Sequence, residues 1–322
     1  MLITSKSEIW VKRLVQQGGH AIRVLGNFKT LARDDLSLVA QFREIKQDAD
    51  WGTPSGVELV FGHILDDRLA LRVAKGCDII IHFAANTGVG PSVRDPRADV
   101  LACVVGTFNY IEAARINKIP RFIFACSGAP VGEAERPIHG ELPSHPVSPY
   151  GADKLAGEAY CSAYKRTFGI DIVILRLGNV YGLGSIYKVS VVAKFIKHAL
   201  AGKPLEIYGD GTQTRDFIYI DHLIDAVLLS ATIPGIGGEI FQIATDREIS
   251  VGELAKNLLA LLKAEDIENI KVINTETRRE DVKRNFSDTT KARHRLGWQV
   301  KTEINYCFKK TISNFLSTYR II

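Results

Sequence analysis

The chain has 322 residues, the length of about two domains or of one large α/β domain with an appended lobe. Its hydrophobic content of 46% and charged content of 24% are ordinary for a globular protein with a substantial core. The net charge of +5 comes from Lys and Arg scattered among acids, which argues against nucleic-acid binding and suits a phosphorylated small molecule.

The five cysteines lie far apart, with no C-x-x-C pair and no His–Cys ligand spacing. This pattern predicts reduced, mostly buried thiols in a cytoplasmic protein without a metal site. The first residues lack the apolar segment of a signal peptide, and apolar runs such as CDIIIHFAA are much shorter than a membrane span of ~20 residues. We therefore expect no membrane association.

Strand-like and helical patterns alternate through the first half of the chain. A short apolar start, a helix containing VKRLV and a Gly-Gly turn come first, and residues 26–56 follow no clear pattern after the next strand. The expected strands are 21–25, 57–62, 78–85, 121–127 and 171–182, and the expected helices are 68–76, 99–117 and 148–169. Nearly continuous β-branched runs separated by helices indicate a parallel sheet covered on both faces.

After residue 182 this alternation loosens into helices separated by Pro, Gly and short strands. The sequence thus predicts an α/β protein with a Rossmann-like doubly wound sheet over residues 1–182, to which part of 215–245 returns. A smaller, interleaved α/β lobe occupies mainly 183–322. The strand ends at Ala84, Ser127 and Asn179 should share the sheet edge at which open α/β sheets bind ligands.

The segment SPYGADKLAGE carries the strongest chemical signal. Ser148 can cap a helix that Pro149 starts, and Tyr150 and Lys154 then share one helix face at i, i+4 spacing. A cation beside a phenol favours phenolate, which makes Tyr150 a usable general acid/base. Ser127, at the end of the strand RFIFACS, could hydrogen-bond the same substrate oxygen.

The motifs HFAA, Ser127, SPYGADKLAGE, LRLGNVYG, IYGDGTQTRDFIYIDH and DTTKARHRLGW follow in order from about Asp78 to Trp298. In this arrangement the chain resembles the extended short-chain dehydrogenase/reductase superfamily. More closely it resembles the nucleotide-sugar epimerase/dehydratase branch typified by UDP-glucose 4-epimerase.

The resemblance implies a dinucleotide-binding sheet domain, a nucleotide-sugar lobe and C4 epimerisation of a UDP-hexose through a transient 4-keto sugar with NAD. Tyr150 would take the proton of the sugar 4-hydroxyl, Ser127 would complete the proton relay and Lys154 would bind the nicotinamide ribose. The implied cofactor-binding residues are Ala84 and Ala85 together with Tyr150 and Lys154. The implied positions for the nucleotide diphosphate are Asn179, Arg215 and Arg278. The apolar helix 99–117 fits the two-helix face through which such proteins form homodimers.

Three positions depart from the family pattern, all on the adenosine half of the cofactor. TSKSE (residues 4–8) replaces the glycine-rich first turn, Gly26-Asn27 replaces the acid after the second strand, and Gly62-His63 replaces a Gly-Asp. The missing acid leaves NADP open beside NAD. The hypotheses are an epimerase with altered cofactor binding, a pseudoenzyme that binds a nucleotide sugar, or a chain with a mis-started or rearranged N-terminus.

A dehydratase or keto-sugar reductase of the same family is a further alternative. The resemblance implies that dehydratases of this family carry an additional carboxylate just after the Ser or Thr, because elimination of water needs an extra acid and base. Here Ser127 is followed by GAPVG, and the first acid is Glu133. This favours epimerisation. Two simpler interpretations also stand: His82 is a packed core histidine, and Arg215 and Arg278 are surface residues paired with Asp216 and Asp281.

Overall fold

The computed structural model describes the chain except for residues 5–7, 28–39, 135–136, 188–189, 278–281 and 320–322. The chain divides into two compact units. The first comprises Met1–Pro130, Ser148–Arg176 and Val227–Phe241, and the second comprises Val131–Val147, Leu177–Ala226 and Gln242–Ile322. The sequence predicts a boundary at residue 182, with part of 215–245 returning to the first domain. In the structure, Val131–Val147 belongs to the second unit, the later boundary follows Arg176, and Val227–Phe241 returns to the first unit.

A sheet of eight described strands, in the order β12-β7-β6-β5-β1-β2-β4-β3, forms the centre of the first unit. The pairings of β1 with β2 and β5, of β4 with β2 and β3, and of β5 with β6 are all parallel. The strands are β1 (Leu2–Thr4), β2 (Ile22–Gly26), β3 (Arg43–Glu44), β4 (Val57–Phe61), β5 (Ile79–His82), β6 (Arg121–Ser127), β7 (Asp171–Leu177) and β12 (Ile240–Ile243).

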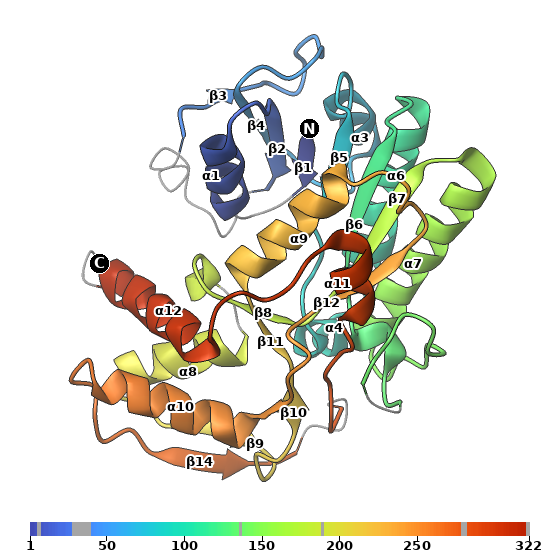
Figure 1. The fold of residues 1–322 in the computed structure, drawn as a ribbon. Helices are drawn as coiled ribbons and strands as arrows, with labels where there is room; N and C mark the ends of the chain where they lie inside the picture. The colour runs from blue at the N-terminus through green and yellow to red at the C-terminus, as the bar shows by residue number, and fades with distance from the viewer. Residues whose placement is uncertain (5–7, 28–39, 135–136, 188–189, 278–281, 320–322) are drawn as a thin grey trace. The chain divides into compact units, whose positions relative to one another are not determined.

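The order in which successive strands are added to this sheet changes direction between β1 and β5. Successive strands run outward from β1 through β2 to β4, then outward on the other side from β5 through β6 to β7. Because parallel crossovers are right-handed, the helices of the two halves cover opposite faces. Figure 1 shows α1 (Glu8–Gln17) on one face, and α3 (Asp67–Val73), α6 (Gly106–Ile116) and α7 (Pro149–Phe168) side by side on the other. The expected doubly wound α/β fold is confirmed, with its switch point at the carboxyl ends of β1 and β5.

Two expected elements are subdivided. The segment 171–182 is not one strand: β7 ends at Leu177, and after Gly178 the short β8 (Asn179–Tyr181) pairs with β11 (Phe217–Tyr219). A Cβ at Gly178 would lie 2.9 Å from the Asp216 carbonyl oxygen, so this close approach of two backbones requires glycine.

The expected helix 99–117 is likewise three elements. It comprises α5 (Pro96–Val100), a π-helical turn η1 (Leu101–Val105) and α6. Asp95 starts it early, because its side chain accepts a hydrogen bond from the Ala98 amide and Pro96 is preset for a first helical position. π-Helical turns inside helices are frequent at functional sites.

The core of the first unit lies between the sheet and the helices α3, α6 and α7. Phe122 and Phe124 of β6, Tyr110 of α6 and Cys161 of α7 are among its fully buried side chains. Gly157 lets α7 approach the sheet, since a Cβ there would lie 2.5 Å from the Phe124 ring. The position of α7 is therefore fixed by direct contact with β6.

The second unit contains short strands and helices. Its amphipathic helices α8 and α10 bury Phe195, Ile196, Leu254 and Leu258. Its elements include β8, α8 (Val191–Leu200), β9 (Leu205–Tyr208), β10 (Thr214–Arg215), β11, the start of α9 (Ile220–Thr232), β13 (Ile249–Ser250), α10 (Val251–Lys263), β14 (Val272–Thr275), α11 (Thr290–Leu296) and α12 (Ile304–Tyr319).

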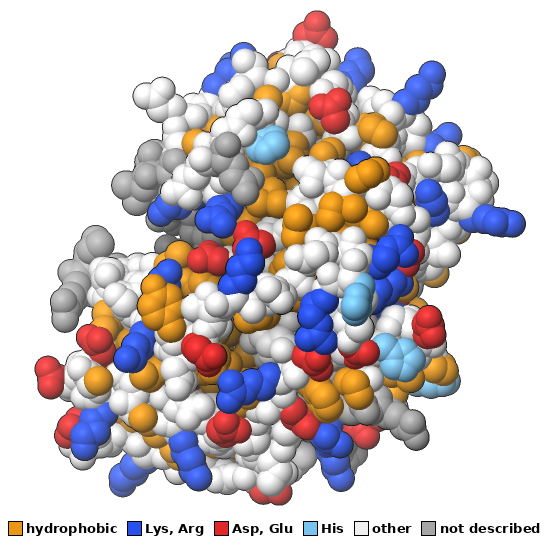
Figure 2. Space-filling model, viewed as in Figure 1, with side chains coloured by type: hydrophobic (Ala, Val, Ile, Leu, Met, Phe, Trp, Pro, Cys, Tyr) orange, Lys and Arg blue, Asp and Glu red, His pale blue; other side chains and the backbone are white. Residues whose placement is uncertain are grey.

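Figure 2 shows Lys and Arg side chains interspersed with Asp and Glu on the face in view, in agreement with the scattered charges of the sequence. All five cysteines are buried and free, as their separation in the sequence predicts. Within the described residues, no helix combines the length and the apolar composition needed to span a bilayer.

Candidate active site

The N-terminus of α7 places Tyr150 in the first helical turn. The Ser148 hydroxyl accepts a hydrogen bond from the Gly151 amide at 3.2 Å, and Pro149 occupies the first helical position, which confirms the predicted cap. The Tyr150 amide donates a hydrogen bond to the Ser92 hydroxyl at 3.1 Å. Ser92 belongs to α4 (Val89–Arg94) and is fully buried. The backbone of the first turn of α7 is therefore fixed by two hydrogen bonds, one to Ser148 and one to Ser92.

The structure brings Ser127 and Tyr150 together. Ser127 is the last residue of β6, and the interaction of its hydroxyl with the phenol lowers the pKa of Tyr150. Burial acts in the opposite direction and is the larger effect, so the pKa of Tyr150 is raised above its ordinary value. Without a bound ligand, Tyr150 is therefore a neutral phenol beside Ser127. It can act as a base only when additional positive charge nearby lowers its pKa.

Lys154 lies one turn further along α7 and is 3% exposed. Its ammonium donates a hydrogen bond to the Ala125 carbonyl oxygen at 2.8 Å and lies 5.0 Å from the centre of the Phe124 ring. These two contacts fix a buried cation above β6. Ser127, Tyr150 and Lys154, all predicted from the sequence, thus belong to one site in the first unit.

His82 is the last residue of β5, and its side chain is buried in the core. Its ring nitrogens lie 2.8 Å from the Thr4 hydroxyl and 3.2 Å from the Thr107 hydroxyl. Burial, assisted by the charge of Lys154, lowers the pKa of His82 to about 3. The interpretation of His82 as a packed core histidine is confirmed.

The predicted cofactor positions Ala84 and Ala85 follow β5 at the switch point. The Phe83 amide donates to the Thr4 carbonyl oxygen at 3.0 Å, and this bond ties the segment after β5 to the end of β1. Residues 5–7 of the TSKSE turn lie outside the described residues. His63 is exposed, and its ring nitrogen Nδ1 accepts a hydrogen bond from the Leu65 amide at 3.2 Å.

The predicted substrate residues fall in the second unit. Asn179 is exposed at the start of β8, and its amide donates to the Asp216 carbonyl oxygen at 2.7 Å. Arg215 is 9% exposed, and its guanidinium donates to the carbonyl oxygens of Thr214 and Val282. Arg278 lies outside the described residues, as does Asp281.

The interpretation of Arg215 as a surface residue is therefore wrong, because its side chain is buried. Asp216 is also buried, and its carboxylate accepts hydrogen bonds from Thr245 and from the Asp246 amide. Burial raises the pKa of Asp216 to about 6. Both side chains thus form hydrogen bonds inside the second unit: Arg215 with the segment at Val282, and Asp216 with the segment at Thr245 and Asp246.

Sequence reasoning missed Asp99 and Asp153, two buried acids beside Lys154. Asp99 is 0% exposed on α5 and Asp153 is 8% exposed on α7. Two signals were present: an acid directly before the apolar run VLACVV, and an acid directly before the lysine in YGADK. Neither signal by itself shows that the two carboxyls meet.

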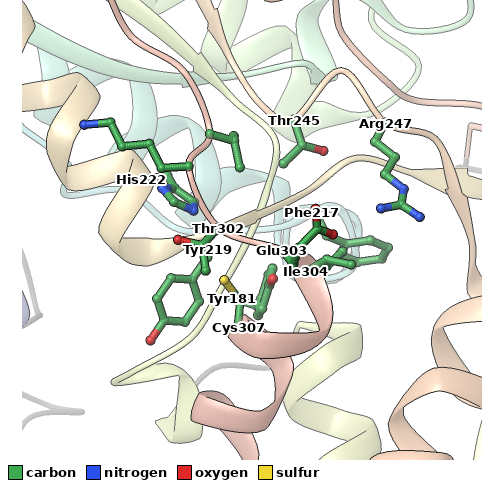
Figure 3. A pocket seen from close by; sticks show the side chains of 12 residues that line it. Tyr181, Phe217, Tyr219, His222, Thr245, Arg247, Thr302, Glu303, Ile304 and Cys307 are labelled. Carbon is green, nitrogen blue, oxygen red and sulfur yellow. The ribbon is translucent and has the colours of Figure 1, made fainter.

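A separate pocket lies wholly within the second unit (Figure 3). Among its lining residues, Tyr181 of β8 and Cys307 of α12 lie close together, and Arg247 lies apart from them on a separate segment. Two of its lining residues are close in sequence to predicted substrate residues. Tyr181 follows Asn179 by two residues on β8, and Phe217 at the start of β11 follows Arg215 by two residues.

Comparisons with known proteins identify the family of the chain and similar folds. The model of the NAD dependent epimerase/dehydratase family matches residues 10–244. UDP-glucose 4-epimerase of Mycolicibacterium smegmatis is 34% identical over 263 residues, which cover 80% of this chain and 82% of that protein. The fold matches UDP-glucose 4-epimerase of Thermotoga maritima, solved with UDP-glucose, at a TM-score of 0.86 and 27% identity over 99% of both chains. It matches UDP-glucose 4-epimerase of Thermus thermophilus, solved with NAD, at a TM-score of 0.84 and 25% identity over 98% of both chains.

Proposed function

Because the chain belongs to the NAD-dependent epimerase/dehydratase family, we propose that it is a UDP-sugar 4-epimerase that uses Tyr150 as its acid/base group. The observation that carries the proposal is the arrangement of three side chains in the first unit: Ser127 beside the Tyr150 phenol, and Lys154 one helical turn away. A UDP-hexose with a free 4-hydroxyl offers the proton that this phenol exchanges.

The residues of the first unit fit a bound dinucleotide. The side-chain oxygen Oδ1 of Asn27, just after β2, is buried and has no hydrogen-bond partner among the described residues. An orphaned acceptor at this point suits a ribose hydroxyl, and an amide there carries no charge to repel a 2′-phosphate. Asn27, Ala84, Ala85 and Lys154 are accordingly the residues that would hold the cofactor, with NAD as the proposed form and NADP as the alternative.

Bound NAD supplies a reversible hydride acceptor for the carbon that carries the 4-hydroxyl. The work of the chain is the proton transfer. As a phenolate, Tyr150 would accept the proton of the 4-hydroxyl when that carbon is oxidised, and as a phenol it would return the proton when the opposite face of the 4-keto sugar is reduced. Ser127 would hydrogen-bond the same oxygen, and the fixed ammonium of Lys154 would stabilise the phenolate form of Tyr150 that accepts the proton.

The surroundings of Ser127 favour epimerisation over dehydration. Gly128, Ala129 and Pro130 follow it without a carboxylate. The next acid, Glu133, belongs to the second unit, where its carboxylate accepts a hydrogen bond from the Lys283 amide at 2.9 Å. An elimination that needs a second acid/base finds none directly after Ser127.

The decisive experiment uses the purified full-length chain with UDP-glucose and UDP-galactose in the presence of added NAD. We expect interconversion of the two sugars, followed by proton NMR of the hexose H4 signal, and release of nicotinamide dinucleotide on denaturation. UDP-sugar binding in calorimetry without turnover across a panel of UDP-hexoses would establish the pseudoenzyme instead. A 4-keto-6-deoxy product would assign the dehydratase activity.

We also propose that the protein is a homodimer through an apolar face formed by α5, η1 and α7. Val100, Leu101, Val105 and Tyr160 are each 38–40% exposed on it, and Tyr160 packs against Phe108 of α6. Large apolar side chains gathered on two packed helices are typical of a surface that a second copy covers. The cytoplasm remains the predicted compartment.

Light scattering should give twice the chain mass for the wild type, and Leu101→Glu should shift the protein to monomer by placing a charge in the contact. Val272→Glu, at a 42% exposed position of β14 in the second unit, is the control and should leave the mass unchanged. A monomeric wild type at micromolar concentration would contradict this assembly.

A further inference from the structure

The two buried acids beside Lys154 form an unusual cluster. Asp99 is fully buried, Asp153 is 8% exposed, and their side chains interact across the contact between α5 and α7. Both oxygens of Asp99 and Oδ2 of Asp153 are buried without a well-formed hydrogen bond in the described part of the chain. Two interacting carboxyls that are both buried cannot both keep a charge without donors, so one proton between them relieves both the repulsion and the burial cost.

The other groups around the pair are few. On α7, Tyr150 and Lys154 flank Asp153; on η1, the buried Cys103 donates from its Sγ to the Asn86 carbonyl oxygen at 3.3 Å. The Asn86 amide interacts with Asp99, and the neighbouring groups of β6 are Cys126 and Ser127.

Among the charged groups, Lys154 is the cation that acts on Asp99. Glu158, one turn further along α7, forms an ion pair with Arg176. On α4, Ser92 binds the Tyr150 amide and Arg94 is exposed.

We propose that Asp99 and Asp153 are a positioning pair for this site: they share one proton, and the single negative charge that they keep balances Lys154 and limits the negative potential at Tyr150. The proposal rests on the function proposed above for its kinetic consequence, but the shared proton is a property of the folded chain itself. The pair makes the ionisation of Tyr150, and with it the proposed activity, depend on the protonation of Asp99 and Asp153.

The direction of that response follows from burial. Burial raises the pKa of Asp153 to about 7, the carboxyl of Asp99 acts in the same direction, and the pKa of Asp99 is also raised. Above about pH 7 the pair therefore carries two negative charges beside one ammonium. The charge of Asp99 raises the pKa of Tyr150, so the extra charge makes the phenol harder to ionise.

The first test is thermal unfolding of wild type and Asp153→Asn at pH 5 and pH 8. The folded wild type holds a proton that the unfolded chain releases near pH 4, so its stability falls as the pH rises toward 7. Asparagine keeps an N–H donor without this titration. The melting temperature of Asp153→Asn relative to wild type should rise by roughly 3–8 °C between pH 5 and pH 8.

Asp78→Asn, an exposed substitution in the same unit, is the control and should show no such change. Asp99→Asn provides a second variant with the same expected trend. A melting-temperature difference that is equal at both pH values for both variants overturns the shared proton, whatever the activity of the protein.

The second test is the pH dependence of kcat/KM with a UDP-hexose. Between pH 7 and pH 9 kcat/KM should rise less steeply for the wild type than for Asp153→Asn, so the ratio of variant to wild type should increase by about threefold or more. A merely structural role would lower kcat/KM by the same factor at every pH, and that result would contradict the positioning role. Absence of turnover in the wild type refutes the proposed function, while the unfolding test still decides the pair.

Discussion

Replacement of Tyr150 by phenylalanine should lower kcat for UDP-sugar epimerisation by about 10²–10⁴-fold, the usual contribution of a positioned general acid/base. The substitution removes only the hydroxyl, and the aromatic ring keeps its place in the first turn of α7. The turn is held by Ser148 and Ser92 through the backbone, so it does not depend on the phenol. The loss should therefore appear in kcat and not in folding.

Steady-state kinetics with calorimetry of UDP-sugar binding separates the two effects. We expect the dissociation constant of UDP-sugar to stay within about threefold of wild type, because the nucleotide contacts lie elsewhere. Tyr306→Phe, at a 52% exposed position on α12, is the matched control and should keep wild-type kcat. A Tyr150→Phe protein with more than half of the wild-type kcat would remove Tyr150 from the mechanism.

The second large effect should come from the buried ion pair that joins α7 to β7. Glu158 and Arg176 form two hydrogen bonds of 2.7 Å, and their side chains are 6% and 3% exposed. Removal of one partner leaves an uncompensated charge in the interior, which costs about 3–5 kcal/mol of unfolding free energy. Glu158→Ala should therefore show a strongly reduced midpoint in urea or thermal unfolding.

Two comparisons show whether burial is the cause. Arg115→Ala removes a similar two-bond pair with Glu112 on α6, but these side chains are 38% and 22% exposed, so solvent screens the charges and the unfolding midpoint should change little. The double substitution Glu158→Gln with Arg176→Met replaces both charges at similar volume and should recover much of the stability. Equal losses for Glu158→Ala and Arg115→Ala would show that burial of the pair contributes nothing.

The parts of the site that the sequence predicted are those encoded by local signals. The segment SPYGADKLAGE contains its own N-cap, its first-position proline and the i, i+4 spacing of Tyr150 and Lys154, so the geometry of α7 is fixed within a few residues. Ser127 was predictable for a similar reason, because a buried strand of a parallel sheet ends at it. The parallel order of the sheet follows from the alternation of strands and helices.

The features that escaped prediction depend on partners distant in sequence. The π-helical turn between α5 and α6 lies where Thr107 bonds the Cys103 carbonyl oxygen and Cys103 reaches Asn86. The meeting of Asp99 with Asp153 requires α5 and α7 to pack together, and the break at Gly178 is set by the backbone at Asp216. None of these contacts leaves a periodic pattern in the local sequence.

The five thiols have a practical consequence for experiments on this protein. Each is buried, and burial raises the pKa of each, to about 11 for Cys103, so very little thiolate exists at neutral pH. Alkylating and disulfide-forming reagents attack the thiolate, and they also need access to it. A single cysteine introduced at an exposed position would consequently be the fast-reacting thiol of the folded chain. Fluorophores or spin labels can then be attached to each unit in turn without removing a native cysteine, two of which adjoin Tyr150.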